Sequence, residues 1–471
     1  MFFDALDEST PMEHTVEIAI VGSGPVGITL AKKLSKRFNV LVIEAGELKN
    51  SLIARESLYG TISGIPYPIA DVRARMFGGS SSLWAGYCAQ FENEDFELCP
   101  WIPNSGWPIC ADEILNYYPE AASILHVEDA CFTPTKLKYG NLVHPTPEFS
   151  EIFQPSVWRF GEKKADFAAE NLTTLTKNRD LNVLLNACVT NIHLTAAQNS
   201  SVEYLDIKTI KGRVGKVRAK LFILATGGIE TPRLLLNSRQ QNKHGVANKS
   251  QKVGKFFMEH PHVTIEGIKI NGIAQLDEWT NVCRTDKGQN FTRCLGITFN
   301  ERKRTKILNA RAHFFYSPEM SADEPPRVGL FFEQAPNPNS QISLTEKKDR
   351  LDVPLVDLNW NLTDLDRHSF EVTAKKVAHE LIRIKLATQT GNIGISNEIL
   401  YSNHQLGTTR MSKEANDGIV DSSCKAHDLE NLYIIGGSVF PTVSWANPTL
   451  TVLALTLRLA DHINKIQISN S

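Results

Sequence analysis

The sequence predicts an α/β fold in which a parallel, doubly wound sheet is interleaved with a second, largely antiparallel sheet. Three observations predict it. A strand, a glycine turn, a helix and a second strand follow one another in residues 16–44. Buried-strand patterns return after residue 181, and short alternating runs separated by turns fill residues 261 to 360. Parallel strands need helical crossovers, whereas alternating runs joined by short turns are typical of antiparallel sheets.

The composition is that of an ordinary soluble globular protein. The chain has 471 residues, 42% hydrophobic and 22% charged residues, and a formal net charge of -2. This length suggests two or three domains, and the charge gives no reason to expect nucleic acid as a partner. The start, "MFFDALDEST", lacks the basic and apolar regions of a secretory signal, and no apolar run reaches roughly 18 residues. We therefore expect a cytoplasmic protein without a membrane span.

Cysteine usage argues against disulfides and against zinc. The eight cysteines are widely scattered, with no CxxC pair and no His-Cys cluster at the spacing of a zinc site. We therefore expect free thiols and no bound metal.

The first segment has the pattern of a βαβ unit. Val16 to Val21 is a nearly continuous apolar run that suits a buried parallel strand. Leu30, Ala31 and Leu34 then recur at helical spacing, and a second apolar run ends at Glu44. The order of these patterns predicts a strand, a helix and a neighbouring parallel strand.

Three glycines in the turn of this unit suit a dinucleotide. Gly22 permits the tight turn, Gly24 lets the backbone approach a pyrophosphate, and Gly27 allows close packing of helix on strand. Glu44, 22 residues after Gly22, is placed to accept hydrogen bonds from ribose hydroxyls. A glycine turn that binds nothing is the alternative, and the fingerprint by itself fits both NAD and FAD.

A second cluster of glycine and serine in residues 71–90 bears on that choice. Its N–H and hydroxyl groups suit the lining of a cofactor site, and a plain NAD dehydrogenase has no evident use for it. Residues 101–125 follow with aromatic and turn residues that are typical of a pocket wall.

The remaining patterns predict five segments in two domains. Strands between 181 and 224 and a helix after "ATGG" resume the first sheet, while an apolar face at Ala374, Val377, Ala378, Leu381 and Ile382 predicts a helix on the second. We assign residues 1–84, 170–260 and 400–471 to a Rossmann-like domain, and residues 85–169 and 261–399 to a lid and substrate domain.

The C-terminal segment predicts a buried strand, a Gly-Gly-Ser turn, a loop and a final helix. Asn447 suits an N-cap and Pro448 suits the first helical position, so the helix N-terminus would present unpaired N–H groups beside Thr449. Such groups, aimed at a flavin ring, would stabilise its anionic reduced form. An ordinary capped helix is the alternative.

Six motifs in this order resemble the glucose-methanol-choline (GMC) family of FAD-dependent alcohol oxidoreductases. Besides the first βαβ unit they are "ARMFGGSSSLWAG", "ATGGIETPRLLLNS", "VGKFFMEHPH", "HQLGTTRM...GIVD" and "NLYIIGGSVFPTVSWANPTLTVLAL". "NSGWPI", "FMEHP" and "ANPTLT" are most similar to the pyranose oxidase and bacterial glycoside 3-oxidase branch. The resemblance implies a Rossmann-like FAD-binding domain interleaved with a substrate domain.

The resemblance also implies the reaction. It implies oxidation of a secondary alcohol of a sugar, glycoside or polyol to a ketone, with hydride passing to flavin N5 and electrons then to oxygen or another acceptor. His404, before Gly-Thr, matches the family's active-site histidine, and Asn447 matches its partner. A neutral imidazole suits a base near pH 7, whereas an amide can only orient the substrate and stabilise alkoxide character.

Further residues are implied as FAD contacts, and one family feature is missing. The contacts are Gly22, Gly24 and Gly27 at the pyrophosphate, Glu44 at the ribose, Gly79, Ser80 and Ser81 along the ribityl chain or flavin edge, Val189 at the adenine, and Ser438 and Thr449. At the position where some relatives carry a flavin-linked histidine this chain has Leu83, so we expect FAD to be non-covalent. Trp84 follows where Asn or His is common.

Several alternatives stay open on the sequence alone. The enzyme could oxidise a non-sugar alcohol in secondary metabolism, act as a GMC-fold lyase without redox turnover, or be a monooxygenase, for which no second glycine fingerprint is present. Without the resemblance, His404 would be an ordinary loop histidine. His260 and His262 beside Glu259 superficially suggest a metal site, but their spacing around Pro261 favours a structural role.

Overall fold

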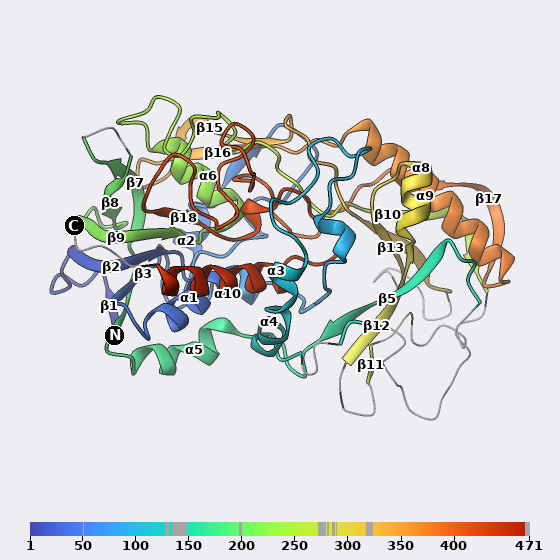
Figure 1. Ribbon diagram of the computed structural model, residues 1–471, viewed down its shortest axis with the longest axis horizontal. Coiled ribbons are helices and arrows are strands. Elements are labelled where there is room, and N and C mark those ends of the chain that lie inside the picture. Colours follow the sequence, from blue (N-terminus) through green and yellow to red (C-terminus); the bar gives the residue numbers. More distant parts are fainter. Residues whose placement is uncertain are drawn as a thin grey trace.

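The sheet predicted from the glycine turn lies at the centre of one half of the molecule in this computed structural model (Figure 1). The structure describes residues 1–49, 51–127, 131–133, 148–196, 200–271, 279, 282–284, 288, 290–316 and 324–466. Residues 128–130 and 134–147 of the predicted lid segment lie outside them.

Within these residues the first sheet has eight strands in the order β1-β6-β3-β2-β9-β8-β7, and β18 pairs with β9. Strands β1, β6, β3, β2, β9 and β18 run parallel, and β7, β8 and β9 form an antiparallel edge. The strands are β1 Phe2–Asp4, β2 Glu13–Val21, β3 Val40–Ile43, β6 Leu181–Leu185, β7 Cys188–Leu194, β8 Val202–Lys208, β9 Val214–Leu224 and β18 Leu432–Ile434. The predicted parallel sheet is confirmed.

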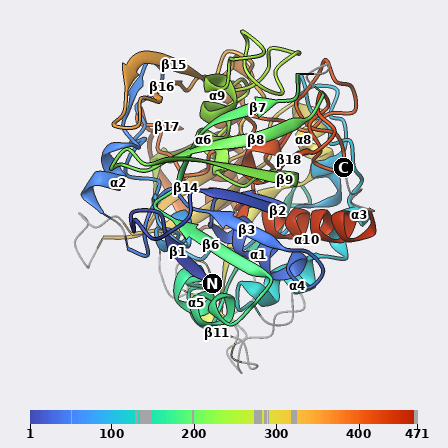
Figure 2. The ribbon, with the colours of Figure 1, turned by 90° about the vertical axis from the view of Figure 1, so that its left-hand side faces the viewer.

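Helices cover both faces of this sheet (Figures 1 and 2). Helix α1 (Pro25–Leu34) packs against α10 (Thr449–Lys465) on one face, and α6 (Gly227–Asn237) lies on the other. All four residues of β3 and the last four of β9 are buried, as expected for parallel strands covered on both sides. The continuous apolar runs in the sequence therefore mark the middle of a three-layer structure.

The second sheet is antiparallel and forms the other half of the molecule (Figure 1). Its described strands have the order β11-β12-β13-β14-β10-β17, with β5 paired to β12. They are β5 Phe153–Phe160, β10 His262–Ile270, β11 Cys283–Arg284, β12 Asn290–Ile297, β13 Ala310–Phe315, β14 Arg327–Phe332 and β17 Ala387–Ile395. Helix α9 (Asp364–Arg383) packs on this sheet through Phe370, Ala374, Val377, Ala378 and Leu381, which confirms the predicted apolar face.

A third, three-stranded sheet differs from the sequence expectation. Strands β15 (Gln341–Lys348) and β16 (Pro354–Asn359) do not extend the large antiparallel sheet but pair with each other, and β16 pairs with β4 (Gly60–Ile62). Val356, Leu358 and Trp360 bury their side chains in a separate core that includes Tyr67 and Phe257. Burial in that core, which includes segments distant in sequence, explains why β15 and β16 lie apart from the large antiparallel sheet. The five-segment domain division stays a prediction.

Short elements connect these layers. They are α2 Leu52–Glu56, α3 Asp112–Leu115, α4 Tyr118–Ile124, α5 Phe167–Thr176, α8 Phe299–Thr305, and the 3₁₀ turns η1 Gly79–Ser82, η2 Asn93–Phe96 and η5 Gly437–Val439. Among the described residues, no helix combines the length and apolar character needed to cross a membrane.

Candidate active site

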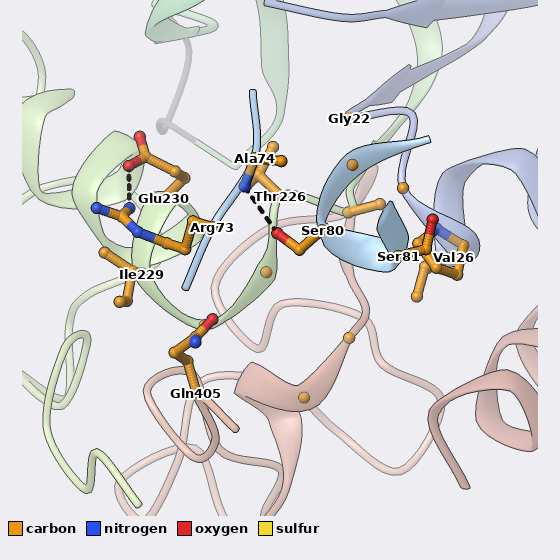
Figure 3. Close-up of a pocket in the computed structure, with 18 of the residues that line it drawn as sticks. Gly22, Val26, Arg73, Ala74, Ser80, Ser81, Thr226, Ile229, Glu230 and Gln405 are labelled. Carbon is orange, nitrogen blue, oxygen red and sulfur yellow. Dashed lines mark hydrogen bonds and ion pairs between the residues drawn. The ribbon is translucent and has the colours of Figure 1, made fainter. Parts of the chain in front are cut away.

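A cavity of about 450 Å³ lies at the carboxyl ends of the parallel strands. Its wall includes residues that come just after β2, β3, β9 and β18, at the edge where open α/β sheets bind ligands. Most predicted site residues line it: Gly22, Gly24, Glu44, Gly79, Ser80, Ser81, Val189, His404, Asn447 and Thr449. Figure 3 shows part of this wall, with Gly22 and Val26 near Ser80 and Ser81, and Gln405 on another side.

The glycine turn has the geometry that its sequence predicts. Gly22 has a φ of 99°, in the region that favours glycine, and its N–H donates to the carbonyl of Ile43 at 2.8 Å. A Cβ on Gly27 would lie 1.9 Å from the carbonyl oxygen of Gly22, so this residue allows the helix to pack on the turn. Gly27 itself does not line the cavity.

Gly24 provides the test of whether a dinucleotide fits. A Cβ placed on it would meet nothing within 4 Å, and Gly24 caps helix α1 at the cavity wall. The N-terminus of a helix carries unpaired N–H groups and about half a positive charge, which suits a diphosphate. The turn is therefore an open cradle with the electrostatics of a pyrophosphate site.

Glu44 is a buried carboxylate held in place by neighbouring donors. Its Oε2 accepts from the Ser23 backbone N–H at 3.1 Å and from the Ser23 hydroxyl at 2.6 Å, and its Oε1 accepts from the Gly46 N–H at 2.8 Å. Burial raises the pKa of this carboxyl, and the hydrogen bonds partly offset that effect. Remaining lone pairs suit the hydroxyls of a ribose.

An ionic network beside this end of the cavity was missed by sequence reasoning. Arg73 pairs with Glu230 (Figure 3), and Arg233 contacts Glu230 at 3.2 Å and Asp349 at 2.9 Å. Burial alone would raise the pKa of Glu230, but the guanidinium groups outweigh it and lower the pKa to about 2. These residues come from three segments that are distant in the sequence, so their spacing gives no signal.

The two predicted serines form local hydrogen bonds in the second glycine cluster. The Ser80 hydroxyl accepts from the Ala74 N–H at 3.1 Å (Figure 3), and the Ser81 hydroxyl donates to the Gly78 carbonyl at 2.6 Å. Their side chains therefore shape the turn that forms the cavity wall.

Ser438 is the other predicted residue that the structure does not bring to the cavity. Its side chain is fully buried and accepts from the Thr409 hydroxyl at 2.7 Å, while its neighbours Gly436 and Gly437 line the cavity. Of the Gly-Gly-Ser turn, the two glycines therefore line the cavity, and the serine side chain is bonded to Thr409.

The loop that carries His404 is fixed by a buried carboxylate. Glu259, fully buried, accepts hydrogen bonds from the backbone N–H groups of Ser402 and His404. His404 Nδ1 lies 2.8 Å from His260 Nδ1, and His404 lines the cavity. Burial, followed by the neighbouring histidines, lowers the pKa of His404 well below its usual value. At neutral pH the ring is therefore uncharged and able to accept a proton.

Asn447 lines the same cavity but is not the N-cap that its sequence suggested. The helix α10 begins at Thr449 with Pro448 at the cap position and no side-chain cap, so the N-cap prediction is wrong. The Asn447 side chain instead accepts a hydrogen bond at its Oδ1 from the indole N–H of Trp158 at 2.8 Å. An indole is only a donor, so this bond fixes the orientation of the amide and leaves its N–H groups as donors.

Glu259, His260 and His262 all contact the loop that carries His404. The described part of the chain contains no group of three or more histidine, cysteine or acidic side chains placed to hold a metal ion. Glu259 serves the backbone of the loop, and the His262 ring contacts the Ser402 hydroxyl at 2.7 Å. The spacing around Pro261 favoured a structural role over a metal site, but the "MEHPH" motif gave no sign that this role is contact with the loop of His404.

Known proteins resemble this chain in sequence and in fold. Residues 336–456 match the GMC oxidoreductase family. Over nearly its whole length, the chain is 23% identical to 2-methyl-1,2-propanediol dehydrogenase of Mycolicibacterium austroafricanum, an alignment that covers 97% of this chain and 96% of that protein. The segment that carries His404 and Asn447 is therefore a GMC oxidoreductase segment. Members of this family bind FAD.

Two further similarities concern one relative in sequence and one solved structure. It is 29% identical to the fructose dehydrogenase large subunit of Gluconobacter japonicus over 53% of its own length and 48% of the relative, so this match spans about half of each protein. A crystal structure of formate oxidase superposes with a TM-score of 0.66 at 16% identity and covers 97% of this chain and 99% of that one. The structural likeness shows the fold.

Proposed function

We propose that this protein is an FAD-dependent oxidoreductase of the GMC type that oxidises a secondary alcohol of a sugar, glycoside or polyol to a ketone, with His404 as the base and Asn447 as its partner. The observation that carries the proposal is that one cavity is lined both by the dinucleotide cradle at Gly22, Gly24 and Glu44 and by the pair His404 and Asn447. A cofactor in the cradle and an alcohol beside the pair would share that space.

The two side chains offer complementary hydrogen-bonding groups to a hydroxyl. Oxidation of an alcohol to a ketone removes a hydride from carbon and a proton from oxygen, and FAD, when bound, supplies the acceptor for the hydride. The uncharged His404 takes the hydroxyl proton. Asn447 donates an amide N–H to the same oxygen, which stabilises the negative charge that develops there. The base and the donor therefore act on a single oxygen atom.

The FAD contacts that we propose follow the cavity wall. Gly22, Gly24 and the start of α1 hold the pyrophosphate, Glu44 the ribose, and the backbone at Val189 the adenine. Gly79, Ser80, Ser81 and Thr449 line the part nearer the flavin.

A sugar is the substrate class that we favour. The fructose dehydrogenase large subunit is named for a sugar substrate, and it is 29% identical to this chain over about half of the chain's length. The diol dehydrogenase, which matches nearly the full length, favours the second candidate, a non-sugar alcohol. In either case, oxygen or another acceptor would then take up the electrons from the reduced FAD.

The experiment that tests the proposal is an anaerobic titration of the FAD-loaded protein with a panel of alcohols. We expect flavin absorbance to bleach with fructose, a pyranose or a glycoside, and the product to be a ketone. Bleaching only by simple diols would select the second candidate. Turnover of a cyanohydrin with an unchanged flavin spectrum would contradict oxidation and indicate a lyase.

We predict that acid precipitation releases all the FAD into the supernatant. Leu83 lines the cavity at the position where some relatives carry a flavin-linked histidine, and its side chain has no nucleophile. The measurement compares flavin absorbance in the supernatant and in the washed pellet. A yellow pellet would show a covalent bond at another residue.

A further inference from the structure

His260 forms a direct ring-to-ring contact with the proposed base. Its Nδ1 lies 2.8 Å from Nδ1 of His404, with the two rings nearly perpendicular at 88°. The His260 side chain is fully buried and stacks on Phe331, with ring centroids 4.9 Å apart and an interplanar angle of 16°. Packing therefore holds the His260 ring in one orientation, with Nδ1 toward His404.

The other nitrogen of His260 must carry a hydrogen. Its Nε2 lies 2.9 Å from the backbone carbonyl oxygen of Ser444 and 3.2 Å from that of Val443. A carbonyl oxygen only accepts hydrogen bonds, so Nε2 is the donor. Ser444 is held in place because its hydroxyl donates to Asp95 at 2.6 Å.

A neutral His260 then has a lone pair at Nδ1. Burial lowers the pKa of His260 to about 4, so the ring carries one hydrogen at neutral pH. That hydrogen is on Nε2, and a neutral imidazole has one donor and one acceptor. His260 Nδ1 is therefore an acceptor, and the hydrogen in the 2.8 Å contact belongs to His404 Nδ1.

We propose that His260 is a positioning residue that holds His404 in the tautomer with hydrogen on Nδ1, so that Nε2 is left without a hydrogen and is the atom that takes the substrate proton. This inference rests on the proposed role of His404 as base. A histidine in a polar loop exchanges between two tautomers, and only one of them presents a lone pair at Nε2. His260 supplies an acceptor at Nδ1 that the other tautomer would leave unpaired.

The test compares three variants of the FAD-loaded protein. In His260→Asn the side-chain oxygen, bonded to Cγ, replaces Nδ1 as an acceptor. In His260→Gln the oxygen lies one bond farther along the side chain, and His260→Leu removes the acceptor. We expect anaerobic flavin reduction to slow on the order of 10²-fold in the leucine and glutamine variants, at the lower end of the general-base effect. The asparagine variant should stay within about tenfold, since it keeps one hydrogen bond.

A second readout does not depend on activity. In protein labelled with ¹⁵N-histidine and carrying FAD, we expect the ¹⁵N shifts of wild-type His404 to show a protonated Nδ1 and an unprotonated Nε2, and the leucine variant to lose that preference. FAD content and thermal midpoint identify variants that fail to fold, in which case the asparagine and glutamine pair carries the comparison.

The outcomes separate this inference from the proposed function. If no alcohol bleaches the wild-type flavin, the proposed function fails, while the ¹⁵N shifts still test the tautomer. A wild-type His404 with hydrogen on Nε2 would overturn the inference. So would equal slowing in all three variants with an unchanged His404 tautomer, because that result would assign His260 to packing alone.

Discussion

Replacing His404 with alanine is expected to slow anaerobic flavin reduction by about 10²- to 10⁴-fold while FAD stays bound. The reason is that a general base contributes this range to proton transfer, and Asn447 has no lone pair basic enough to replace it. The measurement is stopped-flow absorbance of the flavin with a substrate found in the anaerobic titration, together with the FAD-to-protein ratio.

A matched control for this variant is His244→Ala. His244 is exposed and does not line the cavity, so its replacement should leave the reduction rate unchanged. Equal reduction rates for His404→Ala and wild type would refute the role of His404 as base. Loss of FAD from His404→Ala would show instead that the histidine is needed to hold the cofactor.

The second large effect is expected in the glycine turn. Gly24→Ala should weaken FAD binding without lowering the stability of the apo protein, whereas Gly27→Ala should lower both. The Cβ at Gly24 points to open space, and Gly24 has a φ of -69° that alanine adopts, so the apo protein should keep its thermal midpoint. FAD should bind about 10- to 200-fold more weakly, the scale of one misfitting carbon, because the backbone at that point must approach the pyrophosphate.

Gly27→Ala should damage both the fold and the site. Its Cβ would lie 1.9 Å from a backbone oxygen, so the helix must move away from the turn. Overpacking of this kind costs about 1 to 3 kcal/mol or more in the free energy of unfolding. The thermal midpoint of apo protein and FAD titration by fluorescence separate the two variants. A Gly27→Ala protein as stable as Gly24→Ala would contradict this account of the turn.

Some of the site was predictable because the residues that form it are close together in the chain. Gly22, Gly24, Gly27 and Glu44 lie within one βαβ unit, where hydrogen bonds between adjacent strands determine the geometry. The apolar runs and helical spacing likewise predicted β2, β3, β9, α1 and α9. Among the residues of the βαβ unit, the sequence did not predict the hydrogen bonds that Ser23 and Gly46 donate to the Glu44 carboxylate.

Other features depended on contacts between distant segments. The N-cap interpretation of Asn447 was wrong because its side chain bonds to Trp158, 289 positions away, and the strands β15 and β16 joined β4 rather than the large antiparallel sheet. Residues around Glu230 show the same limit, since their charges meet only after three segments pack together.

By itself, the sequence determined that this protein has a dinucleotide-type βαβ unit and an antiparallel sheet, and the motif resemblance identified His404 and Asn447 as the pair to examine. Only the tertiary structure decided that both line one cavity and that the ring of His260 contacts His404 Nδ1. The physical reason is that periodicity records which residues are buried along one element. The donor or acceptor that a buried ring meets depends on which distant backbone carbonyls, here those of Val443 and Ser444, the fold brings beside it.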